Sequence, residues 1–331
     1  MTIEVSPNGA ETPDIEYEDL LGQWSDLEAA LGALLLRPGS VQDFAAKLRL
    51  CDQWLQDLVA HDIDAALYLM FQLASTSTVG YSASHALVCA TLCHILAQEL
   101  ELPARERDSL VRAAFTMNIG MTALQDELAQ QRDPLTPEQQ QTIARHPLDS
   151  LELLEQLHIV DDLWLDVVAQ HHVPLDDKAP LAGLPAQERL NRILGTIDRY
   201  AAMISPRKSR AGKSATDSVR AIVGHDDEQR DEVSLTLVRT IGLCPPGTLV
   251  RLDNGQTALV LRRSDKPNFP MVASLLGARK EPLDPPLLYH TVRGQPRIQS
   301  ALAHSAVALE LLNHRTLVRL GLYAAQRTHS I

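Results

Sequence analysis

The 331-residue chain is poor in aromatic residues, in cysteine and in long apolar runs. Phe, Trp and Tyr make up only 4% of the residues, so leucine, alanine, valine and isoleucine have to build most of the core. Four cysteines are too few for a dense disulfide framework, and the polar, acidic N-terminal segment has no secretory pattern. No apolar run is long enough to span a bilayer. These absences predict a cytoplasmic protein without a membrane span.

Basic residues are also scarce relative to acidic ones. The chain has 30 Lys and Arg against 42 Asp and Glu, which gives a formal net charge of −12. Such a balance disfavours broad binding to nucleic acids or acidic membranes, so no nucleic-acid partner is expected. It leaves room for a local basic pocket that binds a small phosphate ligand.

Leucine-rich segments with a helical period predict a mainly α fold. Thr136, Pro137 and Gln139 form the sequence pattern of a capping box at a helix start. Near the C-terminus the period changes to an alternation around Asn254-Gly255, which predicts a β-hairpin. The predicted units are a disordered N-terminus, an N-terminal helical module, a larger helical domain, a β-hairpin element and a C-terminal helix. Their predicted ranges are 1–14, 15–75, 76–245, 246–293 and 294–331.

Five residues are candidate metal ligands. They are His85, His146, His171, His172 and Asp198. A single histidine on an amphipathic helix is usually a partly buried polar residue. The adjacent pair His171-His172 is a stronger signal, since it ends the predicted helix DLWLDVVAQHH and a helix end lets side chains converge. The alternative for this pair is a solvated position favoured by the helix dipole.

Cysteine offers a second metal hypothesis. His85, Cys89 and Cys93 are spaced at i, i+4 and i+8, so they share one stripe of a helix. A zinc site is one interpretation of this spacing. The preferred interpretation is that the two cysteines are small core residues.

Several runs taken in order resemble the HD-GYP family of the HD superfamily. They are YSASHALVCATLCHILAQELEL, AAFTMNIGM, LTPEQQQTIARHPLDSLELL, VVAQHHVPLDD and LNRILGTIDRYAAMI. HD-GYP proteins are phosphodiesterases that hydrolyse cyclic di-GMP at a centre of two or three metal ions. The resemblance covers about residues 76–223, and the segment PPGTLVRLDNGQTALVLRR extends it. It implies an HD-superfamily helical fold in which the five candidate ligands occupy ligand positions of the family.

The central pair of the family pattern is missing. Met117 and Asn118 stand where the family has a His-Asp pair, and Met121 stands where it has a lysine. The family's aspartate bridges metal ions, whereas an amide is a poor bridge and a thioether is too soft for iron or manganese. The family signature HHERxDGxGYPxGL reads HHVPLDDKAPLAGL here, so Val173 replaces the glutamate and residues 179–181 replace the GYP triplet.

A basic stretch, SPRKSRAGKS, follows the last candidate ligand. The family resemblance implies that Arg207, Arg210 and Lys213 bind ligand phosphates, because arginine forks and lysine charges suit phosphate. The alternative is a solvated basic loop on an acidic protein.

These observations favour a catalytically impaired HD-GYP-like signalling protein. It would act through partner proteins of the same pathway or through cyclic di-GMP binding, and would hold no metal or at most one divalent ion, iron or manganese. One alternative is an active metal-dependent cyclic di-GMP phosphodiesterase with a reduced metal site. Another is a structural interaction scaffold that binds neither metal nor nucleotide.

Overall fold

A computed structural model describes most of the chain. The described residues are 12–76, 79–174, 179–205, 207–208, 215–223, 231–264, 266, 269–291, 296–302 and 314–328.

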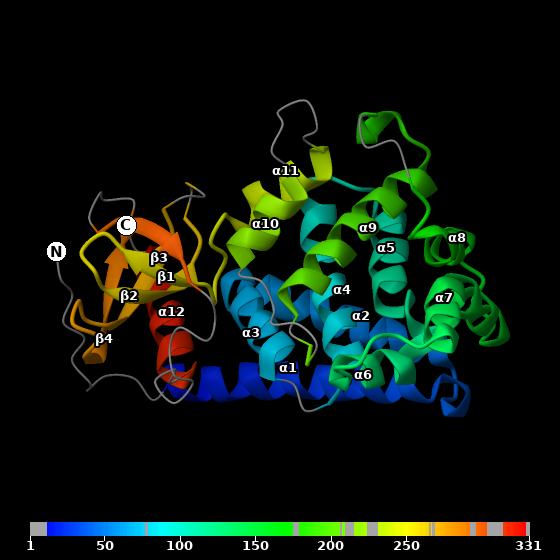
Figure 1. Cartoon of the computed structure of the whole chain (residues 1–331), viewed down its shortest axis with the longest axis horizontal. Coiled ribbons are helices and arrows are strands. Elements are labelled where there is room, and N and C mark those ends of the chain that lie inside the picture. Colours follow the sequence, from blue (N-terminus) through cyan, green and yellow to red (C-terminus); the bar gives the residue numbers. More distant parts are fainter. Residues whose placement is uncertain are drawn as a thin grey trace.

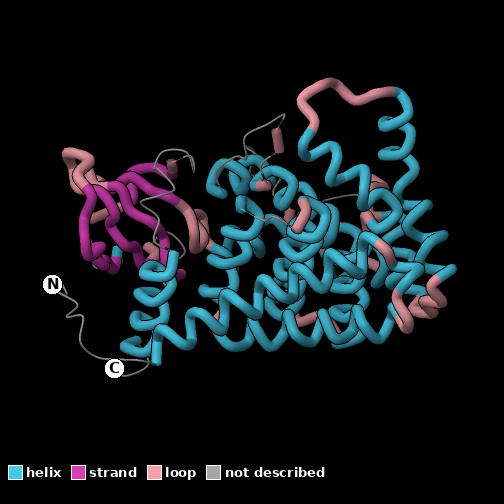
Figure 2. Tube along the Cα trace, turned by 90° about the horizontal axis from the view of Figure 1, so that it is seen from below, coloured by secondary structure: helices cyan, strands magenta, loops and turns pink. Residues whose placement is uncertain are grey.

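Helices form the larger part of the molecule, and a small sheet lies at one end of it (Figures 1 and 2). The described α-helices of this body are α1 (Thr12–Leu36), α2 (Phe44–His61), α3 (Ile63–Thr76), α4 (Tyr81–Glu99), α5 (Ala104–Thr116), α6 (Thr122–Gln130), α7 (Pro137–Gln156), α8 (Asp162–Gln170), α9 (Ala186–Ile204), α10 (Ala215–Val223) and α11 (Glu232–Ile241). Short 3-10 helices are η1 (Pro38–Ser40), η2 (Ile119–Met121) and η3 (Leu181–Gly183). The long helix α1 runs along one side of the body, and α4 is buried over nearly its whole length. The predicted mainly α fold is confirmed.

The sheet is antiparallel throughout, with the strand order β4-β3-β2-β1-β5. Its strands are β1 (Leu249–Leu252), β2 (Thr257–Arg262), β3 (Met271–Leu276), β4 (Pro282–His290) and β5 (Ile298–Ala301), and helix α12 (His314–Thr328) packs beside it. One face contributes Leu249, Leu259 and Leu261 to the main core. The opposite face forms a small separate cluster around Val250 and Val260.

Ion pairs join the sheet to the helical body. Arg262, at the end of β2, contacts Asp62 at 2.6 Å and Asp64 at 3.2 Å. Arg263 contacts Asp64 at 2.6 Å. Both aspartates lie at the start of α3, where negative charge is also favoured by the helix dipole. Among the described residues, no helix is both long and apolar enough to cross a membrane.

Local sequence signals set several element boundaries. The backbone N–H of Gln139 donates to Oγ1 of Thr136 at 3.2 Å, and the side chain of Gln139 accepts from the backbone of Thr136 at 3.0 Å. The predicted capping box at the start of α7 is therefore confirmed. The predicted hairpin is also confirmed, because β1 pairs with β2 around a turn in which Gly255 has φ +81°.

Three expectations about element boundaries need correction. Helix α1 begins at Thr12, inside the range predicted to be disordered, and residues 1–11 lie outside the described part. The β region is a five-stranded sheet rather than a hairpin alone. Residues 298–301 form strand β5 instead of the start of a C-terminal helix, because they complete the free edge of β1. The predicted domain boundaries otherwise stay predictions.

Candidate metal and phosphate site

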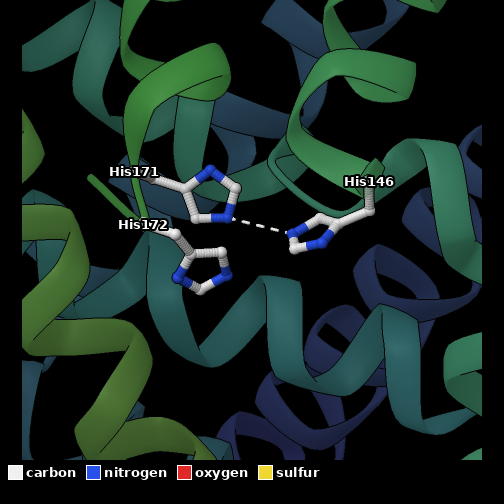
Figure 3. A group of neighbouring side chains, drawn as sticks. All are labelled: His146, His171 and His172. Atoms are coloured by element: carbon white, nitrogen blue, oxygen red, sulfur yellow. Dashed lines mark hydrogen bonds between the residues drawn. The ribbon is translucent and has the colours of Figure 1, made fainter. Parts of the chain in front are cut away.

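Three of the candidate ligands meet between α7 and the end of α8. His146 lies in α7, His171 is the C-cap residue that directly follows α8, and His172 comes next (Figure 3). The Nε2 atoms of His146 and His171 are 3.2 Å apart. The ring centroids of His171 and His172 are 4.1 Å apart, and each of the three rings offers a nitrogen within 4.8 Å of the others. His146 and His171 are buried, while His172 is exposed.

The backbone fixes which nitrogen of His146 carries the proton. Pro147 lies inside α7 and has no N–H, so the carbonyl of Ile143, four residues earlier, lacks its usual helical donor. Nδ1 of His146 contacts this carbonyl at 2.6 Å. A carbonyl only accepts, so Nδ1 must carry the hydrogen. In the neutral ring, Nε2 then presents a lone pair.

His171 is oriented by a helix end. Helix α8 ends at Gln170, so the carbonyl of Val168 belongs to the last turn and has no helical partner. Nδ1 of His171 donates to that carbonyl at 2.7 Å. Its Nε2 therefore also presents a lone pair when the ring is neutral.

Both rings are neutral near pH 7. Burial, with the nearby His172, lowers the pKa of His171 to about 4. Burial also lowers the pKa of His146. Two lone pairs thus face each other at 3.2 Å, and a cation bound between them would satisfy both. Tetrahedral nitrogen ligands at about 2.0–2.1 Å from a metal ion lie about 3.3 Å apart. The three histidines therefore fit a divalent ion.

The other two candidate ligands meet between α4 and α9. Nε2 of His85 lies 2.9 Å from Oδ1 of Asp198, and Sγ of Cys89 lies 3.6 Å from the same nitrogen. The start of α4 is held by Asp126 of α6, which accepts from the backbone N–H of Ser82 at 2.7 Å and from its hydroxyl at 3.0 Å. This cap fixes the helix one turn before His85.

Asp198 links the two groups electrostatically. Burial by itself would raise the pKa of Asp198, but the hydrogen bond and the charge of His85, with contributions from His171 and His172, lower it to about 2. The carboxylate is therefore ionised at neutral pH, and its side chain is 17% exposed. The structure thus brings the five sequence-predicted ligands into two neighbouring groups.

The turn with the missing His-Asp pair lies against α7. Met117 is the C-cap residue of α5, and its carbonyl accepts from the Ser150 hydroxyl at 2.9 Å. The same hydroxyl accepts from the backbone N–H of Gly120 at 3.0 Å. A Cβ on Gly120 would approach the backbone of Ser150 to 2.8 Å, so only glycine fits there. Met117 is buried at 1% exposure, whereas Asn118 and Met121 are half-buried.

Arg207 reaches the group around His85 through an aromatic ring. The guanidinium carbon of Arg207 lies 4.6 Å from the ring centroid of Tyr81, and Nη2 donates to the Tyr81 hydroxyl at 2.8 Å. The Tyr81 ring stacks on His85 with a centroid distance of 5.5 Å and an interplanar angle of 12°. Arg207 is therefore placed beside the candidate metal ligands. Arg210 and Lys213 lie outside the described residues.

Residues 179–184, the described C-terminal part of the altered signature, are hydrogen-bonded to α9. Arg189 donates to the carbonyl of Leu184 at 2.9 Å and to that of Leu181 at 3.2 Å. Arg192 donates to the carbonyl of Ala179 and pairs with Asp231 of the α11 cap through Nε at 2.8 Å. Backbone carbonyls carry most of this attachment, so it tolerates the loss of the GYP side chains.

Sequence reasoning missed two members of this region and grouped a third differently. Tyr81 and Ser150 carry no motif that marks them, since their roles depend on segments that are distant along the chain. Sequence reasoning grouped Cys89 with His85 and Cys93, whereas the structure groups it with His85 and Asp198. Helical spacing placed Cys89 beside His85 correctly and gave no information about α9.

The helical body brings together two groups of side chains that could hold a metal ion, one of three histidines and one of His85, Cys89 and Asp198. The sequence model of the HD domain family matches residues 65–232, about half of the chain, and the chain belongs to this family. Its resemblance to HD-GYP proteins is confirmed by the relatives below.

Two curated relatives are named for an enzymatic activity. The chain is 30% identical over 237 residues to "Cyclic di-GMP phosphodiesterase PA4108" of Pseudomonas aeruginosa, with 69% of this chain and 54% of that protein covered. It is 22% identical over 199 residues to "Cyclic di-GMP phosphodiesterase PdeB" of Borreliella burgdorferi, with 59% and 52% covered. The chain thus spans about half the length of the curated relatives it matches.

A solved structure shares the fold. Bd1817, an HDG"Y"P protein from Bdellovibrio bacteriovorus, superposes with a TM-score of 0.50 at 15% identity, covering 70% of this chain and 73% of that one. At this identity the likeness concerns the fold alone.

Proposed function

We propose that this chain is a cyclic di-GMP signalling protein whose HD centre binds the nucleotide or a partner and hydrolyses little or none of it. The two curated relatives are named as cyclic di-GMP phosphodiesterases, which supports the nucleotide as the ligand class. Arg207, held beside His85 by Tyr81, supplies a cation suited to phosphate.

The observation that carries the proposal is the turn at Met117 and Asn118. It follows α5 directly and is tied through Ser150 to α7, the helix of His146. Neither side chain offers a carboxylate or an imidazole, so neither replaces a bridging aspartate between the two ligand groups. A divalent ion at such a centre supplies positive charge and lowers the pKa of the water it binds. Without a bridge, the three-histidine group and the group of His85 and Asp198 do not hold one shared cluster.

For iron and manganese we therefore propose at most one bound ion per chain. The three histidines hold it through nitrogen lone pairs that are already free at neutral pH. Elemental analysis of protein purified without chelators measures this directly. Two or more iron or manganese ions per chain, lost on Asp198→Ala, would show that a coupled cluster survives.

The test of function combines two measurements on the full chain. Calorimetric titration with cyclic di-GMP should give saturable binding, and chromatography of the nucleotide after incubation with manganese or iron(II) should show negligible product. Absence of heat and of competition at near-millimolar nucleotide would reject the nucleotide and leave a partner-binding scaffold.

One observation favours a second candidate, an active phosphodiesterase with a reduced site. Both ligand groups are assembled, and the rings of His146 and His171 are neutral and aimed at a common point. Turnover that His171→Ala abolishes would support this candidate over the first.

A further inference from the structure

The second ligand group contains a thiol, that of Cys89, to which the proposed function assigns no role. Cys89 lies one helical turn after His85 on α4, so both side chains leave the same face of the helix. Cys89 is fully buried and His85 is 2% exposed. Together with the carboxylate of Asp198 from α9, their ligand atoms all lie within 4.8 Å of one another.

Nε2 of His85 lies between the two other potential ligand atoms, with Oδ1 of Asp198 at 2.9 Å and Sγ of Cys89 at 3.6 Å. One hydrogen on Nε2 is directed at only one of these two atoms. A cation bound by all three atoms engages them together.

We propose that His85, Cys89 and Asp198 form a mononuclear zinc site in which Cys89 is a thiolate ligand. Tetrahedral zinc with Zn–N of about 2.0–2.1 Å and Zn–S of about 2.3 Å places its nitrogen and sulfur ligands about 3.6 Å apart. The distance between His85 Nε2 and Cys89 Sγ is 3.6 Å. A nitrogen and a carboxylate oxygen on zinc lie about 3.3 Å apart. The carboxylate of Asp198, now 2.9 Å from Nε2, reaches that distance by withdrawing about 0.4 Å.

The fourth coordination position of the proposed zinc ion lies on the solvent-accessible side of the site. Asp198 is 17% exposed, whereas the other two ligands are buried, so water or a ligand oxygen approaches past the carboxylate. Binding releases the thiol proton of Cys89 to solvent, and the sulfur lone pair forms the bond to zinc. Three protein ligands plus one open position is the arrangement found in catalytic zinc sites, whereas structural zinc sites have four protein ligands.

The thiolate sets the choice of metal. Sulfur ligands favour zinc and cobalt(II) over manganese and magnesium, which prefer oxygen. The three-histidine group carries no sulfur and does not make this distinction. The proposal goes beyond the proposed function, because a zinc site of this kind exists whether or not the chain binds a nucleotide.

Cys93 provides a matched control for Cys89. It lies one further turn along α4, is equally buried, and is absent from the ligand group. Cys93→Ala and Cys89→Ala remove the same atoms from the same helix. Only Cys89→Ala removes a proposed ligand.

The test is titration of the chelator-stripped full chain with cobalt(II) under anaerobic conditions. Wild-type protein and Cys93→Ala should develop a near-ultraviolet sulfur-to-cobalt charge-transfer band. The intensity of this band should stop rising when one cobalt ion per chain is bound to sulfur. Added zinc should remove the band, and excess manganese should leave it. Cys89→Ala should lack the band. Cys89→Ser, which keeps the polar volume, should also lack it while retaining the wild-type circular dichroism.

A wild-type protein without the band at saturating cobalt would overturn the proposal. So would a band that survives in Cys89→Ala or that disappears equally in Cys93→Ala, since either result would assign the sulfur elsewhere. Calorimetry with cyclic di-GMP separates this outcome from the proposed function. A cobalt–sulfur band without nucleotide binding supports the zinc site alone, and nucleotide binding without the band supports the signalling function alone.

Discussion

Replacing Arg207 with alanine should weaken cyclic di-GMP binding strongly, because this guanidinium is already fixed beside the candidate metal ligands. Its Nη2 donates to the Tyr81 hydroxyl at 2.8 Å, and its carbon lies 4.6 Å from the Tyr81 ring centroid. Its Nε is buried and has no hydrogen-bond partner among the described residues. The Nε donor is therefore suited to a phosphate oxygen, since no existing hydrogen bond of Nε has to break.

The size of the effect follows from the kind of bond lost. A hydrogen bond to a charged group contributes roughly 1.5–3 kcal/mol. At about 1.4 kcal/mol for each factor of ten, Arg207→Ala should raise the dissociation constant roughly ten- to a hundredfold. Tyr81→Phe keeps the ring that stacks on His85 and removes only the hydroxyl partner of Arg207. Its effect should be smaller than that of Arg207→Ala.

The assay is calorimetric titration of each variant with cyclic di-GMP, with Lys208→Ala as the control. Lys208 is the next residue and is exposed, and its backbone N–H donates to the carbonyl of Ala129 whatever its side chain is. The variant Lys208→Ala therefore removes the same positive charge as Arg207→Ala without disturbing the local backbone. Equal losses in Arg207→Ala and Lys208→Ala would show a diffuse charge effect. Wild-type affinity in Arg207→Ala would refute the assignment of this residue.

Three further variants test the site and the body around it. Met117→His with Asn118→Asp should raise manganese occupancy above that of the wild type in elemental analysis, because it returns two ligand types to the turn; unchanged occupancy would count against this turn as a metal position. Pro147→Ala should raise the melting temperature, because proline inside a helix is unfavourable by about 3 kcal/mol. It should also weaken metal binding roughly ten- to a hundredfold in metal titrations, since a backbone N–H then competes with His146 for its carbonyl. Burial lowers the pKa of His94 from 6.5 to about 4. Between these pH values His94 is protonated in the unfolded chain and neutral in the folded chain, so lowering the pH favours unfolding. Wild-type stability should therefore fall by up to about 3 kcal/mol from this group between about pH 6.5 and pH 4, and urea unfolding of His94→Gln should show a correspondingly smaller fall.

Signals confined to a few neighbouring residues predicted the fold well. The capping box at Thr136 and the turn at Asn254-Gly255 depend on side chains and dihedral angles within four residues, and both are present. Strand β5 was missed because Ile298–Ala301 is short and gains its hydrogen bonds from β1, almost fifty residues earlier. Strand β4 contains Pro285 and Pro286, which a sheet accepts at an edge, and β4 is an edge strand.

The sequence names the residues of the candidate site but does not show which of them lie next to each other. Motif order named the five candidate ligands, but no spacing shows that Asp198 pairs with His85 across 113 positions. The partnership of Cys89 with that pair depends on the packing of α4 against α9. The role of Tyr81 under Arg207 depends on a contact across 126 positions. Contacts of this range follow from the tertiary fold, which periodicity does not encode.

The other candidate ligands keep their positions without a His-Asp pair, because backbone features outside the turn at Met117 and Asn118 orient them. His146 is oriented by a carbonyl that Pro147 leaves without a helical donor, and His171 by a carbonyl at the end of α8. His85 is held by the capped start of α4. On the proposals made above, a turn without a bridging carboxylate leaves two cation positions in place of one shared cluster. Their donor atoms differ, nitrogen alone in one and nitrogen, sulfur and oxygen in the other, so their metal preferences differ as well.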